Sequence, residues 1–297
     1  MNYTGELAAL LTAVFWTITA LAFEQASLRV GSLAVNVIRL LLGFIFLSLF
    51  TLVYRGALLP LDASAEAWGW LVLSGFIGFL FGDLFLFKSY TLIGSRFAML
   101  VMTLVPPITA LTGWLVLGEK LSLLSYAGMF LTIAGISLAI FNRNRADGKI
   151  SLKLSLKGLL FAFFGAIGQA VGLVISKLGM GDYDPFAATQ IRILAGFVGF
   201  VALVTILRRW PRIVSALQHT KGMVGIGIGS FFGPFLGVSF SLLAIQYTQT
   251  GIASTLMALV PILIIPPVVI FYKQKITWAE IAGVVISLCG VTLLFIR

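Results

Sequence analysis

Charge is scarce in this chain: only 10% of its 297 residues are Asp, Glu, Lys or Arg, whereas 60% are hydrophobic. Ordinary soluble domains carry about 25% charged and about 45–50% apolar residues. A water-soluble globule of this length cannot hide so much apolar surface, and disordered chains and coiled coils need more charge. Together with a mean hydropathy of +1.10, these values exclude all three classes and indicate that lipid is the main solvent of the chain.

Cysteine and histidine are almost missing as well. The one cysteine, Cys289, lies in an apolar stretch, and the one histidine, His219, lies in a charged segment. An intrachain disulfide, a cysteine-based metal site and a Ser–His relay are therefore excluded. The glycines of residues 225–229 are not followed by Lys-Ser or Lys-Thr, so they do not form a phosphate loop. We expect a protein that is not an enzyme and that holds no metal or cofactor.

Long uncharged runs dominate the rest of the chain. A bilayer core about 30 Å thick is crossed by roughly 20 helical residues. Residues 222–272 contain 51 positions without a formal charge, too many for one crossing, and the polar cluster at 246–251 divides them in two. No run alternates as the strands of a membrane barrel do, so we predict an all-α integral membrane protein with ten transmembrane helices. They are Leu7–Phe23, about Ala34–Tyr54, Ala67–Gly82 continued past Asp83, Phe97–Gly118, Leu121–Asn142, Gly158–Ser176, about Pro185–Leu207, two within Gly222–Tyr272, and Ile281–Ile296.

The two parts of the chain repeat each other. With a shift of 153 positions, residues 38–43 (Ile-Arg-Leu-Leu-Leu-Gly) align with residues 191–196 (Ile-Arg-Ile-Leu-Ala-Gly). With a shift of 155, residues 104–106 (Leu-Val-Pro) align with residues 259–261, and the glycines at 78, 82, 128 and 135 align with those at 233, 237, 283 and 290. A gain of two residues between spans 7 and 8 explains the change of shift. This ordered series indicates an internal duplication.

Each copy holds five spans, an odd number, so the second copy must be inverted relative to the first. The predicted units are a first repeat at residues 1–142, a basic cytoplasmic linker at 143–157 and an inverted second repeat at 158–297. Inverted repeats are a transporter architecture, in which the substrate site lies near the membrane midplane between the halves and rocking exposes it alternately. A duplicated scaffold without a transport role is the less favoured alternative.

A spaced series of residues crosses spans 4 and 5: Pro106, Gly118-Glu119, Gly128 and Gly135. The second copy keeps its proline and both glycines but has Gln274 in place of the glutamate. This series resembles the signature of the EamA-type ten-span exporters in the drug/metabolite transporter superfamily, and Trp16 and Arg39 also look like family features. The resemblance implies a carrier that exports small metabolites, amino acids or drugs, with a cavity lined by spans 1, 3, 4, 6, 8 and 9.

Asp83 is the first candidate for function. A carboxylate inside a span is costly unless it faces a cavity or a partner. Its repeat-related position holds Val238, so the acid is not part of the duplicated scaffold. Proton uptake and the binding of an amine substrate are the functions that fit it. The alternatives are a structural ion pair with Lys88 or Arg96 and snorkelling of the carboxylate to water near the end of the third span.

Five further side chains are candidates for the wall of the substrate pathway. Trp16 and Gln169 occupy matching mid-span positions, where a tryptophan is far from the interfacial belts and a glutamine needs a hydrogen-bond partner. Met99, Met102 and Met257 lie on the proline-containing spans 4 and 9, and flexible thioethers suit a pocket of variable shape. Ordinary helix packing is the alternative for all five.

Arg39 and Arg192 are related by the repeat and are therefore expected near opposite membrane faces. As gate residues they would pair with Glu24 and with Asp182 or Asp184, one set on each side. The alternative is interfacial anchoring, in which the charged heads reach water.

Lysine and arginine are distributed unevenly between the predicted loops. With both termini outside, the cytoplasmic connections carry 14 of these residues and the outer ones carry 4, and cytoplasmic loops are the ones that gather Lys and Arg. We therefore predict outside termini and a cytoplasmic linker in a bacterial-type inner (plasma) membrane. The same bias explains the net charge of +10 without nucleic acid, and contact with anionic lipid would follow from it.

These observations predict a secondary transporter that moves a small organic metabolite (an amino acid, a nucleoside or a drug-like molecule) across the cell membrane by alternating access, with export as the direction. The substrate's own gradient or protons would drive it. One chain already holds both halves, so a monomer is the expected functional unit. A lipid flippase or scramblase with a lateral groove is one rival. An integral-membrane enzyme is another, but it needs clustered histidines or carboxylates, which this chain lacks.

Overall fold

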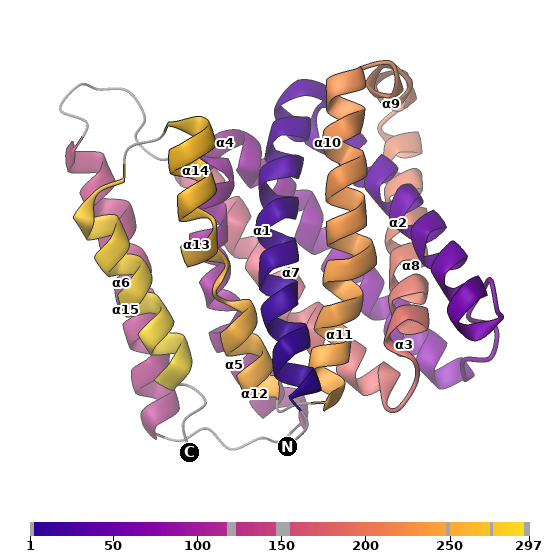
Figure 1. Ribbon diagram of the computed structural model, residues 1–297, viewed down its shortest axis with the longest axis horizontal. Helices are drawn as coiled ribbons and strands as arrows, with labels where there is room; N and C mark the ends of the chain where they lie inside the picture. The colour runs from indigo at the N-terminus through magenta and orange to yellow at the C-terminus, as the bar shows by residue number, and fades with distance from the viewer. Residues whose placement is uncertain (1–2, 118–122, 147–154, 248–249, 274–275, 294–297) are drawn as a thin grey trace.

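A computed structural model describes residues 3–117, 123–146, 155–247, 250–273 and 276–293, and every regular element in these ranges is helical (Figure 1). The all-α class predicted from the sequence is therefore confirmed. Glu119, Gln274 and most of the predicted linker at 143–157 lie outside the described ranges.

The helices are α1 (Thr4–Val30), α2 (Ser32–Arg55), α3 (Ala65–Gly75), α4 (Asp83–Val101), α5 (Val105–Leu117), α6 (Leu123–Ala146), α7 (Leu156–Met180), α8 (Pro185–Ile206), α9 (Trp210–Leu217), α10 (Thr220–Ser230), α11 (Val238–Tyr247), α12 (Thr250–Met257), α13 (Val260–Leu263), α14 (Ile265–Tyr272) and α15 (Trp278–Leu293). Two π-helical segments, η1 (Phe76–Gly82) and η3 (Phe231–Gly237), and a 3₁₀ turn, η2 (Met102–Leu104), complete the described elements.

Six helical stretches are long and apolar enough to cross a membrane, and three shorter apolar helices accompany them. The longest stretch, Ala65–Val116, has 52 residues and bends at Gly94. The φ of Gly94 is 75°, a left-handed value that glycine adopts without the steric cost of a side chain. The third predicted span therefore continues to this bend, and Lys88 lies inside α4 rather than in a connection.

The two π-helical segments lie at repeat-related positions. η1 and η3 are each 7 residues long, and they are separated by 155 positions, the same shift that aligns the two sequence copies. Pro234 in η3 has no N–H to donate, so a regular α-helical hydrogen bond is lost there. π-helical turns are rare, and those that occur are often found at functional sites. Their presence at matched positions shows that the backbone repeats along with the sequence.

Glycines let repeat-related helices approach closely. α7 packs on α3, η1 and α4, and α1 packs on α10, η3 and α11 (Figure 1). A Cβ on Gly82 would lie 3.3 Å from the backbone nitrogen of Gln169, and a Cβ on Gly237 would lie 2.9 Å from the side chain of Trp16. Both partners in these contacts are matched by the repeat, so the two contacts are copies of one interface.

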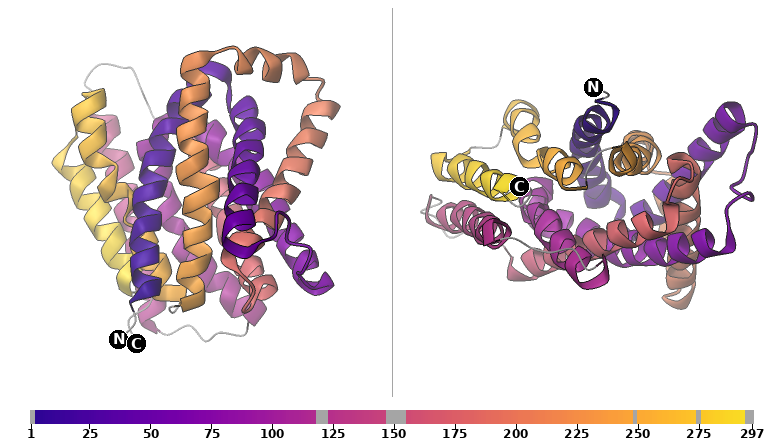
Figure 2. Two further views of the ribbon diagram at one scale, coloured as in Figure 1. Left: turned by 45° about the vertical axis from the view of Figure 1, so that its right-hand side comes forward. Right: turned by 90° about the horizontal axis from the view of Figure 1, so that it is seen from below.

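α6 and α15 form a pair at one edge of the bundle (Figure 2). A Cβ on Gly135 would lie 2.4 Å from the backbone nitrogen of Ser287, and a Cβ on Gly290 would lie 2.4 Å from that of Thr132. The Thr132 hydroxyl lies 3.3 Å from the carbonyl of Ser287, to which it donates. Each residue is matched by the repeat to a residue across the contact, as in a two-fold interface between separate subunits.

A polar cluster joins the halves at the end of the molecule where α2 and α7 finish. The Tyr183 hydroxyl donates to Asp62 at 2.9 Å, and Arg55 donates to the same carboxylate at 2.6 Å. Slight burial raises the pKa of Asp62, but these hydrogen bonds outweigh it and hold the pKa below its ordinary value. Burial and the bond to Asp62 raise the pKa of Tyr183 to about 12. At neutral pH the Asp62 carboxylate is therefore ionised and the Tyr183 hydroxyl keeps its proton.

Replacing Gly135 or Gly290 by alanine is expected to destabilise the α6–α15 pair, because the added methyl group meets backbone atoms that have little room to move. Overpacking of this kind costs about 1–3 kcal/mol. Gly227→Ala is the matched control, since its Cβ meets nothing within 4 Å and alanine favours a helix by about 1 kcal/mol over glycine. Thermal unfolding of the purified variants should show lower midpoints for the first two only. Equal midpoints for all three would contradict the interface.

Candidate functional site

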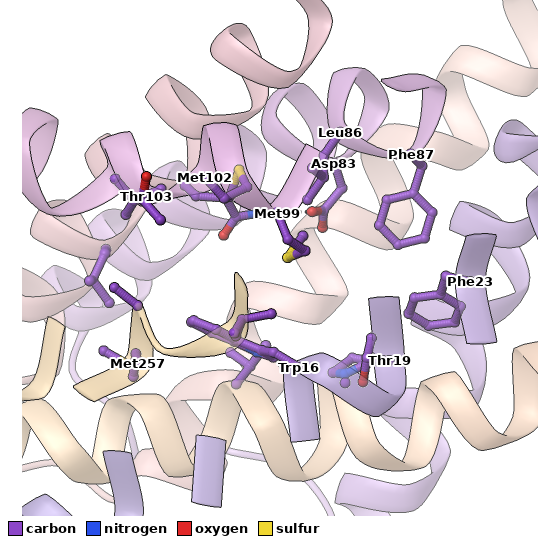
Figure 3. A pocket seen from close by; sticks show the side chains of 18 of the residues that line it. Trp16, Thr19, Phe23, Asp83, Leu86, Phe87, Met99, Met102, Thr103 and Met257 are labelled. Atoms are coloured by element: carbon purple, nitrogen blue, oxygen red, sulfur yellow. Dashed lines mark hydrogen bonds between the residues drawn. The ribbon is translucent and has the colours of Figure 1, made fainter. Parts of the chain in front are cut away.

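A cavity of about 130 Å³ lies between the two halves of the chain (Figure 3). Each enclosed water needs roughly 10–15 Å³ on this scale, so the space suits about ten waters or one small organic molecule. Its walls come from α1, α2, η1, α4, η2, α5, α7, η3, α11, α12 and α13. All six predicted pathway residues line it: Trp16, Asp83, Met99, Met102, Gln169 and Met257. Their role in binding a substrate stays a prediction.

Matched positions of the two copies supply much of the lining. Four such pairs are Trp16 and Gln169, Met102 and Met257, Val105 and Val260, and Pro106 and Pro261. The cavity therefore lies where the copies meet. Two other matched positions differ in chemistry, since Asp83 is matched by Val238 and Phe79 by Pro234. The one carboxylate among the described lining residues therefore comes from a position at which the two copies differ.

Asp83 is the centre of a buried polar network. Its side chain forms an ion pair with Arg39, and the two residues are 4% and 3% exposed. Gln169 Nε2 donates to the other carboxylate oxygen at 2.7 Å, and Arg39 Nε donates to the side-chain oxygen of Asn36 at 3.0 Å. α2 and α4 from the first copy and α7 from the second copy thus hold the network together, and both oxygens of Asp83 are engaged.

The expected pairing of Arg39 with Glu24 is wrong. Glu24 accepts a hydrogen bond from the Ser95 hydroxyl at 2.5 Å, and Asp184 accepts one from the backbone at the start of α8. Arg39 and Arg192 each lie about two turns inside their helices, and both are buried. They therefore reach the interior of the bundle rather than its two ends, which also makes them unsuited to interfacial anchoring.

Aromatic rings enclose both arginines. The Arg39 guanidinium lies 4.5 Å from the ring centroid of Phe87 and 5.7 Å from that of Phe79. The Arg192 guanidinium lies 5.2 Å from the same Phe79 ring. A desolvated cation–π contact is worth about 2 kcal/mol, so the shared ring lowers the cost of burying two like charges near each other.

Sequence reasoning missed several lining residues. Phe87 and Tyr90 follow Asp83 by four and seven positions in α4 and line the cavity with it. That spacing puts them on one helix face, so both could have been predicted from the sequence as neighbours of Asp83. Thr19 and Ser254 also line the cavity, and their hydroxyls have no hydrogen-bond partner among the residues that the structure describes. Nothing in the sequence distinguishes these two from other small polar residues of the spans.

The wall of the cavity has the composition of a small-molecule site. Within the part of the chain that the structure describes, no three His, Cys, Asp or Glu side chains gather to hold a metal ion. Most of the wall consists of aliphatic, aromatic and thioether groups, joined by a few hydroxyl, amide and indole groups. An apolar wall with a small number of placed polar groups is typical of a small-molecule site.

The sequence profile of the EamA-like transporter family matches this chain twice, over residues 3–141 and 156–296. The chain belongs to the EamA-like transporter family. The two matches coincide with the two sequence copies whose junction forms the cavity. This EamA-like chain is thus a multi-pass membrane protein of a transporter family, built from two repeats.

One solved crystal structure of a protein resembles the EamA-like chain with a TM-score of 0.65. The similarity covers 99% of this chain and 97% of the other, at 18% sequence identity. At that level of identity the likeness shows the fold alone. No curated protein matches the sequence.

Removing one member of the Arg39–Asp83 pair is expected to cost about 3–5 kcal/mol, because the remaining charge stays buried without its partner. Arg39→Met and Asp83→Leu should each lower the unfolding midpoint. The double variant should recover much of the loss, since neither charge then remains. Thermal unfolding of the four proteins gives the coupling between the two sites. A double variant as unstable as the sum of the two single changes would contradict the pair.

Proposed function

We propose that the protein is a secondary transporter that carries a small organic molecule, such as an amino acid, a nucleoside or a drug-like compound, through the cavity between its halves. The observation that carries the proposal is the place of the cavity, which is lined by matched residues of both copies and contains the Asp83–Arg39 pair. In inverted-repeat carriers the site lies at this junction, and rocking of the halves exposes it alternately. Export is the proposed direction, and one chain is the proposed functional unit.

We infer ten crossings arranged as two inverted sets of five. The bend at Gly94 supports this count by dividing the 52-residue stretch, and the three shorter apolar helices supply material for further crossings. The α6–α15 contact supports the inversion, because residue numbers rise along one helix as they fall along its neighbour. α1 begins and α15 ends at the same end of the molecule (Figure 1), as an even number of crossings requires.

Glu24, Arg39 and Arg192 are proposed as residues whose contacts change between the outward-open and inward-open states. Arg39 lines the cavity, whereas its repeat-related counterpart Arg192 is absent from the lining. If the halves exchange conformations, these two arginines exchange environments. Glu24 accepts its hydrogen bond from Ser95, next to the bend at Gly94, so movement of this bend would break that contact.

Efflux from proteoliposomes, measured with and without a pH gradient, tests the transport function. We expect saturable efflux of at least one compound from a panel of labelled amino acids, nucleosides and cationic dyes. Trp16→Ala should lower it roughly tenfold, because an aromatic wall of the cavity is lost. Trp114→Ala is the matched control, since Trp114 is 47% exposed and lies outside the lining.

The same assay with Asp83→Asn separates proton coupling from structure. Loss of the gradient-driven flux in a variant that keeps its gradient-independent flux would make Asp83 the coupling site, and unchanged flux would leave a carrier driven by its substrate. Loss of both fluxes would assign Asp83 a structural role. No flux of any solute, together with movement of lipid between the leaflets, would overturn the proposal in favour of a scramblase.

We propose that both termini lie outside and that the linker faces the cytoplasm of a bacterial-type cell. Asp182 follows α7 and Arg212 lies in α9, so they lie at opposite ends of α8, and both are exposed. In a Cys289→Ser background, Asp182→Cys should react with an impermeant thiol reagent in intact cells, and Arg212→Cys should react only after permeabilisation. The opposite pattern would reverse the orientation.

A further inference from the structure

The buried charges of the described residues do not balance. Within the part of the chain that the structure describes, five charged side chains are buried: Arg39, Asp83, Arg96, Arg192 and Glu280. Arg39 pairs with Asp83, and Arg96 lies 3.6 Å from Glu280. The guanidinium of Arg192 is the charge left over. Asp83 also attracts Arg192 electrostatically, but one carboxylate cannot neutralise two guanidinium groups, so one positive charge stays in excess. Burying an unbalanced charge is costly, so this imbalance calls for a ligand or a neighbour of negative charge.

Arg192 lies one layer of side chains from the cavity. Its guanidinium carbon is 5.2 Å from the ring centroid of Phe79, which lines the cavity. Its Nη2 lies 3.3 Å from the place a Cβ would take on Gly78, and the carbonyl of Gly78 accepts a hydrogen bond from the lining residue Gln169 at 3.3 Å.

The guanidinium of Arg192 is also short of acceptors. A guanidinium carries five N–H donors, yet the Nε of Arg192 has no partner among the residues that the structure describes. The residue is 4% exposed, so bulk water does not supply the missing partners. Phe79, a cavity residue that contacts the Arg192 guanidinium, therefore lies between this cationic donor group and the space in which a substrate would bind.

The cavity itself offers donors but no unused carboxylate. Asp83 is the one acid among its described lining residues, and it uses one oxygen for Arg39 and the other for Gln169. The hydroxyls of Thr19 and Ser254 line the space and have no hydrogen-bond partner in the described part of the chain. An incoming ammonium group would find no free anion here. A carboxylate would find hydroxyl donors and the positive field of two arginines against one acid, and charge-assisted hydrogen bonds are the strong ones.

We propose that the molecule transported by this protein carries a carboxylate or a comparable anionic group, and that Arg192 is the residue that sets this preference. The inference rests on the proposed transport function and names the substrate class of the same cavity. With an anion bound, the charges of the ligand, Arg39, Asp83 and Arg192 sum to zero. The apolar wall formed by Trp16 and the methionines then accepts the uncharged part of the molecule.

Three compounds with one carbon skeleton test the charge preference: 3-phenylpropionate, 3-phenylpropionamide and 3-phenylpropylamine. A ligand that binds the folded state raises its unfolding midpoint, so a thermal titration of the purified protein in a neutral detergent ranks the three. We expect the carboxylate to bind at least about tenfold more tightly than the amide, and the amine to bind most weakly.

Three variants assign the preference to Arg192. Arg192→Gln should reduce the difference between carboxylate and amide to about twofold or less. Arg192→Lys keeps the charge and should retain most of the difference, so the test holds even if the glutamine variant does not fold. Arg212→Gln removes an exposed arginine of α9 and should behave as the unchanged protein does.

Equal affinities for the three compounds, tighter binding of the amine, or no binding of any of them would overturn the proposal. Flux of the same compounds in proteoliposomes tests the transport function separately. Arg192-dependent binding of the carboxylate without flux would refute the transport function and leave only the preference of the cavity for an anionic ligand. Saturable flux that ignores ligand charge would keep the function and refute the inference.

Discussion

The cost of burying charge in a bundle surrounded by lipid governs this structure. Asp83 lies within the longest apolar stretch of the chain, where an isolated carboxylate would be strongly disfavoured. It is kept there by Arg39 from α2 and Gln169 from α7. These contacts join the first copy to the second and fix the position of the buried polar network of Asp83 in the wall of the cavity. The lining and the rings around the two arginines depend on this arrangement.

The features that determine helix packing occur in both copies, whereas the carboxylate of the cavity occurs in one. The matched glycines, the two π-helical segments and the α6–α15 contact occur in both copies, and they set how closely the helices approach. The cavity nevertheless differs between the copies, because Val238 takes the place of Asp83 and Pro234 that of Phe79. Its one described carboxylate therefore lies on the side of the first copy.

The class, the two copies and the six cavity residues could be read from the sequence, because hydropathy and matched positions are visible along the chain. The partner of Arg39 could not, since Asp83 is 44 positions away and the contact depends on how α2 lies against α4. Gly94 lies between the predicted third and fourth spans, but the sequence did not show that this connection is a bend within α4 at one glycine. Arg192 looked like an end-of-helix residue, and only the packing of α8 against η1 and α7 shows that it is buried.

Blocking the cavity tests the central claim, that the substrate passes between the two halves, most directly. In a Cys289→Ser background, Met102→Cys places a thiol on the cavity wall, and Leu115→Cys places one on a side chain that is 73% exposed outside it. Modification with a bulky maleimide should abolish solute flux in the first protein and leave it unchanged in the second. Undiminished flux through the protein modified at position 102 would contradict the account.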